Sequence, residues 1–229
     1  EKDRVYAANV SALDTEIGRI IEAIEQEGIL EDTIILFFSD NGPVFDIDPI
    51  AQVIAPNLIN AKGSTAGLRG SKTSTFEGGI RVPAVIWWKG VIENAKSDQF
   101  FFVQDILPTL LRASNVNVAE TIKFDGKDKW LNLLENKIVP PKNAFIGARL
   151  IADERALFNG KWKLRWTKPQ LIPVSASYSL FDILEDPYEK NDLSEEHPQV
   201  VDAMKKTLTS YIERDVVCLL YTSPSPRDP

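Results

Sequence analysis

Cysteine and histidine are nearly absent from this chain of 229 residues, which contains one of each, Cys218 and His197. The single cysteine excludes an intrachain disulfide framework and a cysteine-based zinc site. The single histidine leaves little material for histidine-based catalysis. It stands in "EEHPQV", directly before a segment of helical periodicity, which indicates a surface or helix-capping residue.

Long hydrophobic runs and an excess of basic residues are lacking as well. The longest apolar runs, "TIILFF" and "VPAVIWW", are much shorter than the roughly 18 to 20 residues that a membrane-spanning helix needs, so we expect no membrane partner. The formal net charge of −7 argues against a general nucleic-acid binder, because phosphate backbones require a basic surface. It does not exclude a local basic pocket for a small anion.

The apolar pattern of the first half predicts an α/β layered sheet. Residues 3–28 place apolar side chains at three- and four-residue steps, which predicts an amphipathic helix. Residues 33–38 are apolar on both faces, as in a central strand that is covered on both sides. A further strand is expected at 82–88 and a helix at 105–113, whereas the proline- and glycine-rich residues 43–71 predict a long loop. Helix, short loop and buried strand together form one unit of such a sheet.

The second half has a different pattern of predicted secondary structure. After "IVPPKN", short strands follow one another, and Asn159-Gly160 is a hairpin signal. A final helix is expected to turn inward its residues Val200, Val201, Met204, Leu208 and Ile212. We therefore predict a larger α/β domain over residues 1–143 and a small α+β subdomain with an antiparallel sheet over 144–215. Residues 216–229 match the sequence pattern of neither half and are interpreted as a non-native or disordered tail.

Asp40 and Asn41 stand where the first predicted strand ends, in "SDNGP". Ligands of open α/β sheets bind at the carboxyl ends of strands. Carboxylate and amide oxygens are donors for hard cations such as Ca²⁺ or Mg²⁺. The same four residues also suit a plain turn, in which Asp and Asn side chains bond their own backbone. Taken alone, the stretch leaves both interpretations open.

A second cluster, "GLRGSKTSTFEGGIR", begins at Gly67. Its glycines allow the backbone to approach a ligand closely. Arg69 and Lys72 could bind a tetrahedral anion, arginine as a fork and lysine as a point charge. A glycine-rich surface loop with solvated cations is the alternative. The spacing of a phosphate-binding P-loop is absent.

The ordered series of motifs resembles the sulfatase family, the arylsulfatase branch of the alkaline-phosphatase-like superfamily. The resemblance extends from "TIILFFSDNGP" through "LRGSKTSTFEGGIRVPAVIWWKG" and "DILPTLL" to "SLFDILEDPYEKNDL". It implies that Asp40 and Asn41 ligate a divalent cation, usually Ca²⁺ with Mg²⁺ as the alternative. It also implies that Lys72 is catalytic and contacts the substrate sulfate. Arg69 remains a substrate-binding candidate from its place in the same cluster. In the family, Glu77 and the two glycines after it shape the loop.

The C-terminal "LFDILEDPYEKNDL" resembles a family segment that packs the small subdomain and does no chemistry. Its acidic residues Asp182, Asp186 and Glu189 are expected to form a solvated turn rather than a second metal site.

Sulfatases use a formylglycine, made from Cys or Ser in a C-x-P-S-R motif, as the nucleophile that attacks the sulfate ester. That motif, the family's N-terminal pair of metal-binding Asp residues and its upstream catalytic residues are absent from residues 1–229. We therefore expect a C-terminal portion of a sulfuric ester hydrolase that is inactive by itself, with sheet edges and apolar surface exposed beside the strand at 33–38. The resemblance implies a small-molecule or glycan sulfate ester as substrate, and a periplasmic, secreted or lysosomal location.

Two alternatives to a sulfatase stay open at this stage. A phosphodiesterase or phosphonate hydrolase of the same superfamily would share the metal-binding core. A non-catalytic module would bind sulfated glycans through Arg69, Lys72 and their neighbours.

Overall fold

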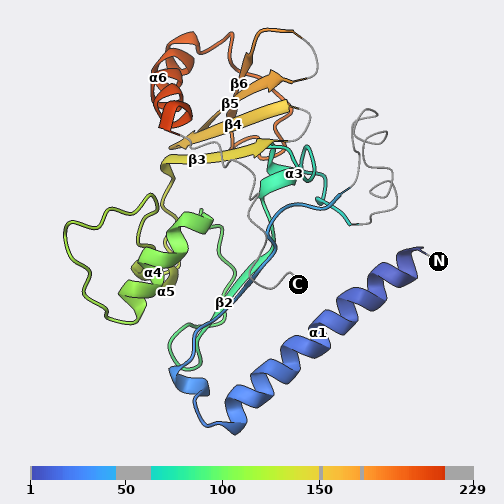
Figure 1. Ribbon diagram of the computed structural model, residues 1–229, viewed down its shortest axis with the longest axis vertical. Coiled ribbons are helices and arrows are strands. Elements are labelled where there is room, and N and C mark those ends of the chain that lie inside the picture. Colours follow the sequence, from blue (N-terminus) through green and yellow to red (C-terminus); the bar gives the residue numbers. More distant parts are fainter. Residues whose placement is uncertain (1, 45–62, 150–151, 171–172, 215–229) are drawn as a thin grey trace, which may run out of the picture.

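The computed structural model describes residues 2–44, 63–149, 152–170 and 173–214 (Figure 1). Among these residues, the first half forms the elements α1 (Lys2–Gln26), β1 (Ile35–Phe38), α3 (Glu77–Ile80), β2 (Ala84–Trp87), α4 (Ile106–Ala113) and α5 (Trp130–Leu134), with short 3-10 turns at Leu30–Asp32 and Val103–Asp105. The second half contains β3 (Lys142–Arg149), β4 (Ala152–Asn159), β5 (Trp162–Pro169), β6 (Ser177–Asp182) and α6 (Pro198–Arg214). No helix of the described part is long and apolar enough to cross a membrane.

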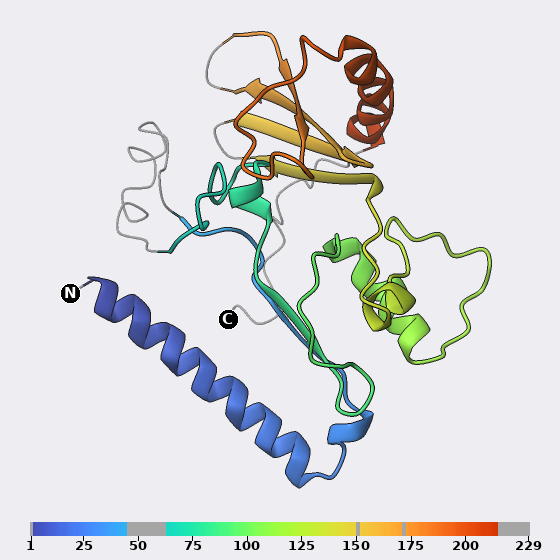
Figure 2. The same cartoon turned by 180° about the vertical axis from the view of Figure 1, so that it is seen from behind.

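Helix α1 confirms the first predicted helix. Gly28 follows it with a φ of 71°, a left-handed conformation that glycine adopts without strain, and its N–H donates to Glu25 O at 3.0 Å. The apolar side chains of Val5, Leu13 and Ile20 are exposed. Figures 1 and 2, seen from opposite sides, both show α1 apart from the two sheets. The amphipathic stripe that the sequence predicts therefore has little to pack against among the described residues.

Strands β1 and β2 form a two-stranded antiparallel ribbon, with Ile35 opposite Trp87 and Phe38 opposite Ala84. Both strands were predicted, but burial of the first on two faces is wrong for the described structure. Phe37 is 40% and Phe38 39% exposed. The physical reason is that α1 stands away from the ribbon, so no helical layer from it covers these rings (Figure 2).

The second sheet is antiparallel with strand order β3-β4-β5-β6, as the hairpin signal predicts. Asn159 pairs with Trp162 across the β4–β5 turn, where Gly160 has a φ of 64°. Because side chains alternate along a strand, neighbouring residues of this sheet contact different partners on its two faces.

One face of the sheet packs against α6. Leu157, Leu164 and Leu180 contact Met204 and Leu208 of the helix, and Val200, Val201 and Ile212 pack around them. The inward face predicted for the last helix is thus confirmed. His197 directly precedes α6, accepts hydrogen bonds from Val200 N and Val201 N through its carbonyl, and lies 5.0 Å from the Trp162 ring, which confirms a helix-start residue.

The opposite face of the sheet packs against the first half of the chain. Ala156, Phe158, Phe181 and Ile183 form a second buried cluster, and the partly buried residues packed against it include Phe76, Ile80, Phe100 and Phe102 of the first half. Phe76 directly precedes α3 and Ile80 is its last residue, so this apolar contact fixes α3 on the sheet. The boundary between residues 143 and 144 stays a prediction. The predicted tail at 216–229 and residues 45–62 of the predicted loop lie outside the described residues.

Replacing Leu208 by alanine tests the α6 face. We expect Leu208→Ala to lower the free energy of unfolding by about 2–5 kcal/mol, because this side chain is fully buried in the core. Urea unfolding followed by circular dichroism measures the change. The exposed Lys206 of the same helix is the matched control, and Lys206→Ala should change stability by less than about 0.5 kcal/mol. Equal effects of the two substitutions would contradict the packing described.

Candidate functional site

Asp40 and Asn41 lie in a bend directly after β1. Asp40 is exposed and Asn41 is half-buried. The hydroxyl of Ser39 donates to the backbone carbonyl of Asn41 at 3.0 Å, which closes the turn. Within the described parts of the chain, no hydrogen bond engages the side-chain oxygens of Asp40 or Asn41. The Ser39 hydroxyl thus holds the turn through the main chain of Asn41, and the side chains of Asp40 and Asn41 keep oxygen atoms that can bind a cation.

Two backbone hydrogen bonds join this turn to the glycine-rich cluster. The N–H of Gly42 donates to Gly79 O at 2.8 Å, and the N–H of Lys72 donates to Pro43 O at 2.9 Å. The two motifs, 32 residues apart between Asp40 and Lys72, thus meet beside α3 (Figure 1).

Glycine is required where the two motifs meet, because their backbones approach too closely for a side chain. A Cβ at Gly42 would overlap the carbonyl oxygen of Gly78. A Cβ at Gly78 would overlap the carbonyl oxygens of Arg69 and Gly70, and the Gly78 N–H donates to Arg69 O at 2.7 Å. These contacts confirm the expectation that the glycines after Glu77 shape the loop.

The two predicted anion-binding residues have different surroundings. Lys72 is exposed, and none of the described residues forms an ion pair with its ammonium group. Arg69 donates from Nη1 to Glu189 O at 2.8 Å, and its guanidinium carbon lies 4.1 Å from the centroid of the Phe76 ring. Lys72 is free to meet an anion, whereas Arg69 joins the loop to a distant turn. Substrate binding by either residue stays a prediction.

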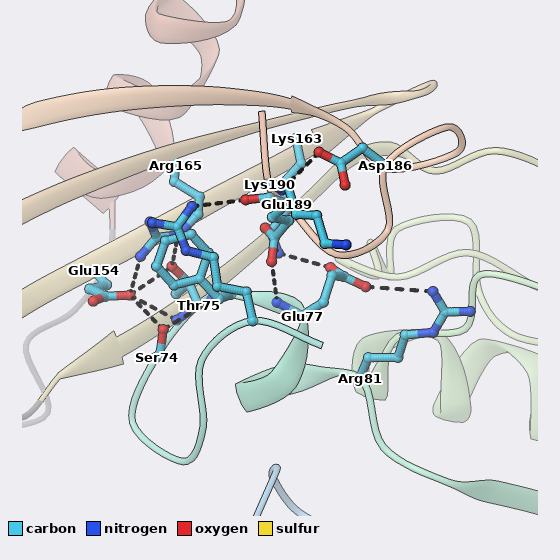
Figure 3. Close-up of polar contacts among 12 residues, drawn as sticks. Ser74, Thr75, Glu77, Arg81, Glu154, Lys163, Arg165, Asp186, Glu189 and Lys190 are labelled. Atoms are coloured by element: carbon cyan, nitrogen blue, oxygen red, sulfur yellow. Dashed lines mark hydrogen bonds and ion pairs between the residues drawn. The ribbon is translucent and has the colours of Figure 1, made fainter. Parts of the chain in front are cut away.

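A buried ionic cluster lies behind the loop (Figure 3). Lys163 Nζ is 2.8 Å from Glu77 Oε1 and 2.8 Å from Glu189 Oε1. The other oxygen of Glu189, Oε2, accepts the backbone N–H of Glu77 at 2.6 Å. The side chains of Lys163 and Glu189 are fully buried. Residues of β5 and of the turn after β6 therefore hold both the backbone and the side chain of Glu77, at the start of α3.

A second group of contacts holds the residues just before α3. Glu154 Oε2 accepts from Thr75 N at 2.8 Å and from Arg165 Nη2 at 2.6 Å. The Arg165 guanidinium carbon lies 3.3 Å from the centroid of the Phe76 ring, so Phe76 is in contact with two arginines, Arg69 and Arg165. The loop is thus anchored to β4 and β5 at two separate points.

Residues from both motifs fall within a segment that matches a known protein family. A family model described as Sulfatase matches residues 1–116, just over half of the chain. The chain belongs to the sulfatase family. The match includes Asp40, Asn41, Arg69 and Lys72, whereas the anchoring residues of β4 and β5 lie beyond it.

Individual sulfatases resemble this chain over most of its length. An uncharacterized sulfatase of Schizosaccharomyces pombe is 31% identical, over 87% of this chain and 41% of the relative. An N-acetylgalactosamine-6-O-sulfatase of Bacteroides thetaiotaomicron is 29% identical, over 86% of this chain and 40% of the relative. A solved sulfatase structure, described under glycosaminoglycan metabolism by Bacteroides thetaiotaomicron, matches with a TM-score of 0.64 and 26% identity, over 88% of this chain and 42% of that chain.

These matches establish the fold class predicted from the sequence: the chain is part of the alkaline-phosphatase-like α/β fold of sulfatases. The chain spans about two-fifths of the length of the curated relatives it matches.

The acidic segment of this sulfatase-family chain differs from the expected solvated turn. Glu189 is fully buried and paired with Lys163. Asp182 is buried and lies 2.6 Å from Lys161 Nζ, and Asp186 Oδ2 accepts the backbone N–H groups of Lys190 and Asn191. The expectation of a solvated turn was wrong because this segment folds back onto the sheet, where its carboxylates find cations and amides.

Burial changes the proton affinity of several of these groups. Burial raises the pKa of the Glu189 carboxyl, against the opposing effect of the Lys163 ammonium. Burial lowers the pKa of the Arg165 guanidinium, which nearby Glu154 partly offsets. Burial alone would raise the pKa of Asp182, but the hydrogen bond from Lys161 and those from backbone N–H groups lower it overall.

The contacts of Lys163, Arg165 and Glu154 and the burial of Glu189 were not predicted from the sequence. One signal was present in "KWKLRW", where Lys163 and Arg165 alternate with three apolar residues, Trp162, Leu164 and Trp166. The apolar residues pack toward α6, so alternation places both cations on the face toward α3. Taken alone, this pattern predicts a strand with one face in solvent. The neighbouring sequence does not indicate that carboxylates from distant segments cover that face.

A methyl group at Gly42 tests the contact between the motifs. We expect Gly42→Ala to destabilise the protein by about 1–3 kcal/mol, because the new Cβ has no room beside Gly78 O. Gly18→Ala is the matched control: its Cβ meets no atom within 4 Å, and alanine favours a helix. Thermal unfolding followed by circular dichroism compares the two. A Gly42→Ala protein as stable as the control would contradict the close approach.

The raised pKa of Glu189 predicts a pH dependence of stability. The folded state keeps the proton of this carboxyl to a higher pH than the unfolded state, whose glutamate pKa is near 4.5. Stability from this group is therefore fully present below that pH and is lost as pH rises through the raised folded pKa. The free energy of unfolding of the native protein, minus that of Glu189→Gln, should fall as the pH is raised from 4.5 through the raised folded pKa. Urea unfolding across this range measures the difference, and a rising difference would contradict the assignment.

Proposed function

We propose that this chain supplies metal-binding and sulfate-binding residues of a sulfuric ester hydrolase. The observation that carries the proposal is the pair of hydrogen bonds from Gly42 to Gly79 and from Lys72 to Pro43, which brings the Asp40–Asn41 turn beside the Lys72 loop. Membership of the sulfatase family supports the reaction class.

Asp40 and Asn41 would hold the divalent cation, in this proposal Ca²⁺ with Mg²⁺ as the alternative. The donors fit a hard cation, because one carboxylate and one amide oxygen are accessible and carry no competing hydrogen bond within the described residues. Two residues supply only part of the shell of about six to eight oxygens that Ca²⁺ takes. A bound cation would neutralise negative charge on the sulfate and nucleophile oxygens.

Lys72 would bind the sulfate group and stabilise the charge that develops on its oxygens in the transition state. Its exposed ammonium is free for this task, and its backbone N–H fixes the loop to the Asp40–Asn41 turn through Pro43. Arg69 is a weaker candidate for the sulfate, because its guanidinium already bonds Glu189 O and packs on Phe76.

Hydrolysis by this route also requires the formylglycine nucleophile of the family. Residues 1–229 contain no C-x-P-S-R motif from which it could form. We therefore propose that residues 1–229 by themselves do not hydrolyse sulfate esters. The name of the Bacteroides relative, an N-acetylgalactosamine-6-O-sulfatase, supports a carbohydrate sulfate ester as the substrate class.

Lys72→Ala in the full-length protein tests this function. We expect kcat/KM for p-nitrophenyl sulfate to fall by about 10²- to 10³-fold, the range found when one donor to a developing oxyanion is removed. Lys168→Ala, which removes an exposed lysine of β5, is the control and should leave the rate unchanged. Asp40→Ala should instead raise the Ca²⁺ concentration needed for half-maximal activity.

Three results would contradict the sulfatase assignment. Faster turnover of bis(p-nitrophenyl) phosphate than of the sulfate would favour a phosphodiesterase. Salt-dependent binding of sulfated glycans without turnover would favour a non-catalytic module. Turnover of p-nitrophenyl sulfate by residues 1–229, above a Lys72→Ala control, would refute the requirement for a formylglycine motif.

A further inference from the structure

The buried cluster around Lys163 holds the first residue of α3 by two independent contacts. Lys163 Nζ binds the side chain of Glu77, and Glu189 Oε2 accepts the backbone N–H of the same residue. Figure 3 shows the contacts of Glu77 with these two partners, one from β5 and one from the turn after β6. The position of α3 is thus set by charged groups outside the segment that carries the predicted site.

From Glu77 the structure leads directly to both parts of the proposed site. Gly79, two residues along α3, accepts the N–H of Gly42, which adjoins Asn41. Gly78 donates to Arg69 O, in the loop that carries Lys72. Since neither Gly42 nor Gly78 has room for even a Cβ, these backbones cannot slide past each other freely. A shift at the start of α3 would therefore move the Asp40–Asn41 turn and the Lys72 loop together.

Net stability is a poor explanation for this cluster. Taking one lysine and two carboxylates out of water is costly, and buried ion pairs often contribute no more than well-packed apolar residues would. Apolar contacts of Phe76 and Ile80 with the sheet already dock the loop, and Glu154 with Arg165 anchors Thr75 separately. The Lys163 cluster adds directional contacts to one point, the backbone and side chain of Glu77.

We propose that Lys163 and Glu189 are positioning residues that fix the start of α3 and thereby hold the Asp40–Asn41 turn and the Lys72 loop in place. The part of this inference that concerns activity rests on the proposed function. The part that concerns backbone position does not, and the two can be measured separately.

Amide hydrogen exchange of Glu189→Gln in the full-length protein tests the positioning. The amides of Gly42 and Lys72, which donate to Gly79 O and Pro43 O, should exchange about tenfold faster or more, as loss of a hydrogen bond to a charged group predicts. Exchange of the β4–β5 ladder amides should not change, because Glu154, Arg165 and the apolar cluster stay intact. Lys163→Arg, which keeps the cation, should remain closer to the native protein than Lys163→Met.

Activity supplies a second readout. In Glu189→Gln, the Ca²⁺ concentration for half-maximal hydrolysis of p-nitrophenyl sulfate should rise about 10- to 100-fold. This is the range found when a residue that orients a metal ligand, without binding the metal itself, is replaced. The KM for the sulfate ester at saturating Ca²⁺ should change less than kcat. Lys161→Met is the matched control: it breaks the ion pair of Lys161, in the β4–β5 turn, with Asp182 at the end of β6, and should leave exchange at Gly42 and Lys72 unchanged.

Native exchange at Gly42 and Lys72 in both Glu189→Gln and Lys163→Met would overturn the inference. So would faster exchange throughout β4 and β5 in Glu189→Gln, because that result would show a general structural role. If exchange at Gly42 and Lys72 rises selectively but the native full-length protein hydrolyses no sulfate ester, the proposed function fails while the positioning role stands.

Discussion

The close contact between the turn after β1 and helix α3 is the constraint on which the rest of the described structure depends. The turn belongs to the β1–β2 ribbon, whereas α3 lies on the four-stranded sheet, so the hydrogen bond between Gly42 and Gly79 connects the two sheets. It also brings together two motifs that the sequence keeps 32 residues apart. Because backbone atoms make this contact directly, the relative position of the motifs does not depend on the conformation of flexible side chains.

The four-stranded sheet explains how that contact is supported. Its leucine-rich face is covered by α6, which leaves the other face to hold the loop. That second face combines a ring cluster, Phe158 and Phe181 against Phe76, with the cations Lys163 and Arg165. Apolar area supplies non-directional attraction, whereas the charged groups fix distances and orientations. The small C-terminal sheet therefore supports the proposed site, although all the proposed ligand-binding residues lie in the first half of the chain.

The sequence predicted what depends on local pattern. The helix ended by Gly28, the hairpin at Gly160 and the inward face of α6 follow from periodicity and turn chemistry, and all three are present. The motifs around Asp40 and Lys72 were predicted because the residues within each motif are contiguous in the sequence. Burial of Glu189 and of Lys163 was not predictable, because it arises from tertiary contacts across 86 residues between Glu77 and Lys163. Exposure of Phe37 and Phe38 agrees with the expected apolar surface beside this strand, whereas the position of α1 away from the ribbon was not predictable from its apolar pattern.

A cation-binding turn faces conflicting requirements, and the structure shows how backbone contacts reconcile them. Oxygens that are to bind a cation cannot be occupied by strong internal hydrogen bonds, yet unrestrained side chains would lose entropy on binding. Here the side-chain oxygens of Asp40 and Asn41 carry no hydrogen bond within the described residues, while the neighbouring Gly42 is fixed through its N–H. The same holds for Lys72, whose ammonium is exposed and whose backbone is bonded to Pro43. Restraint is applied to the main chain, so the groups proposed to bind charge remain available to a ligand.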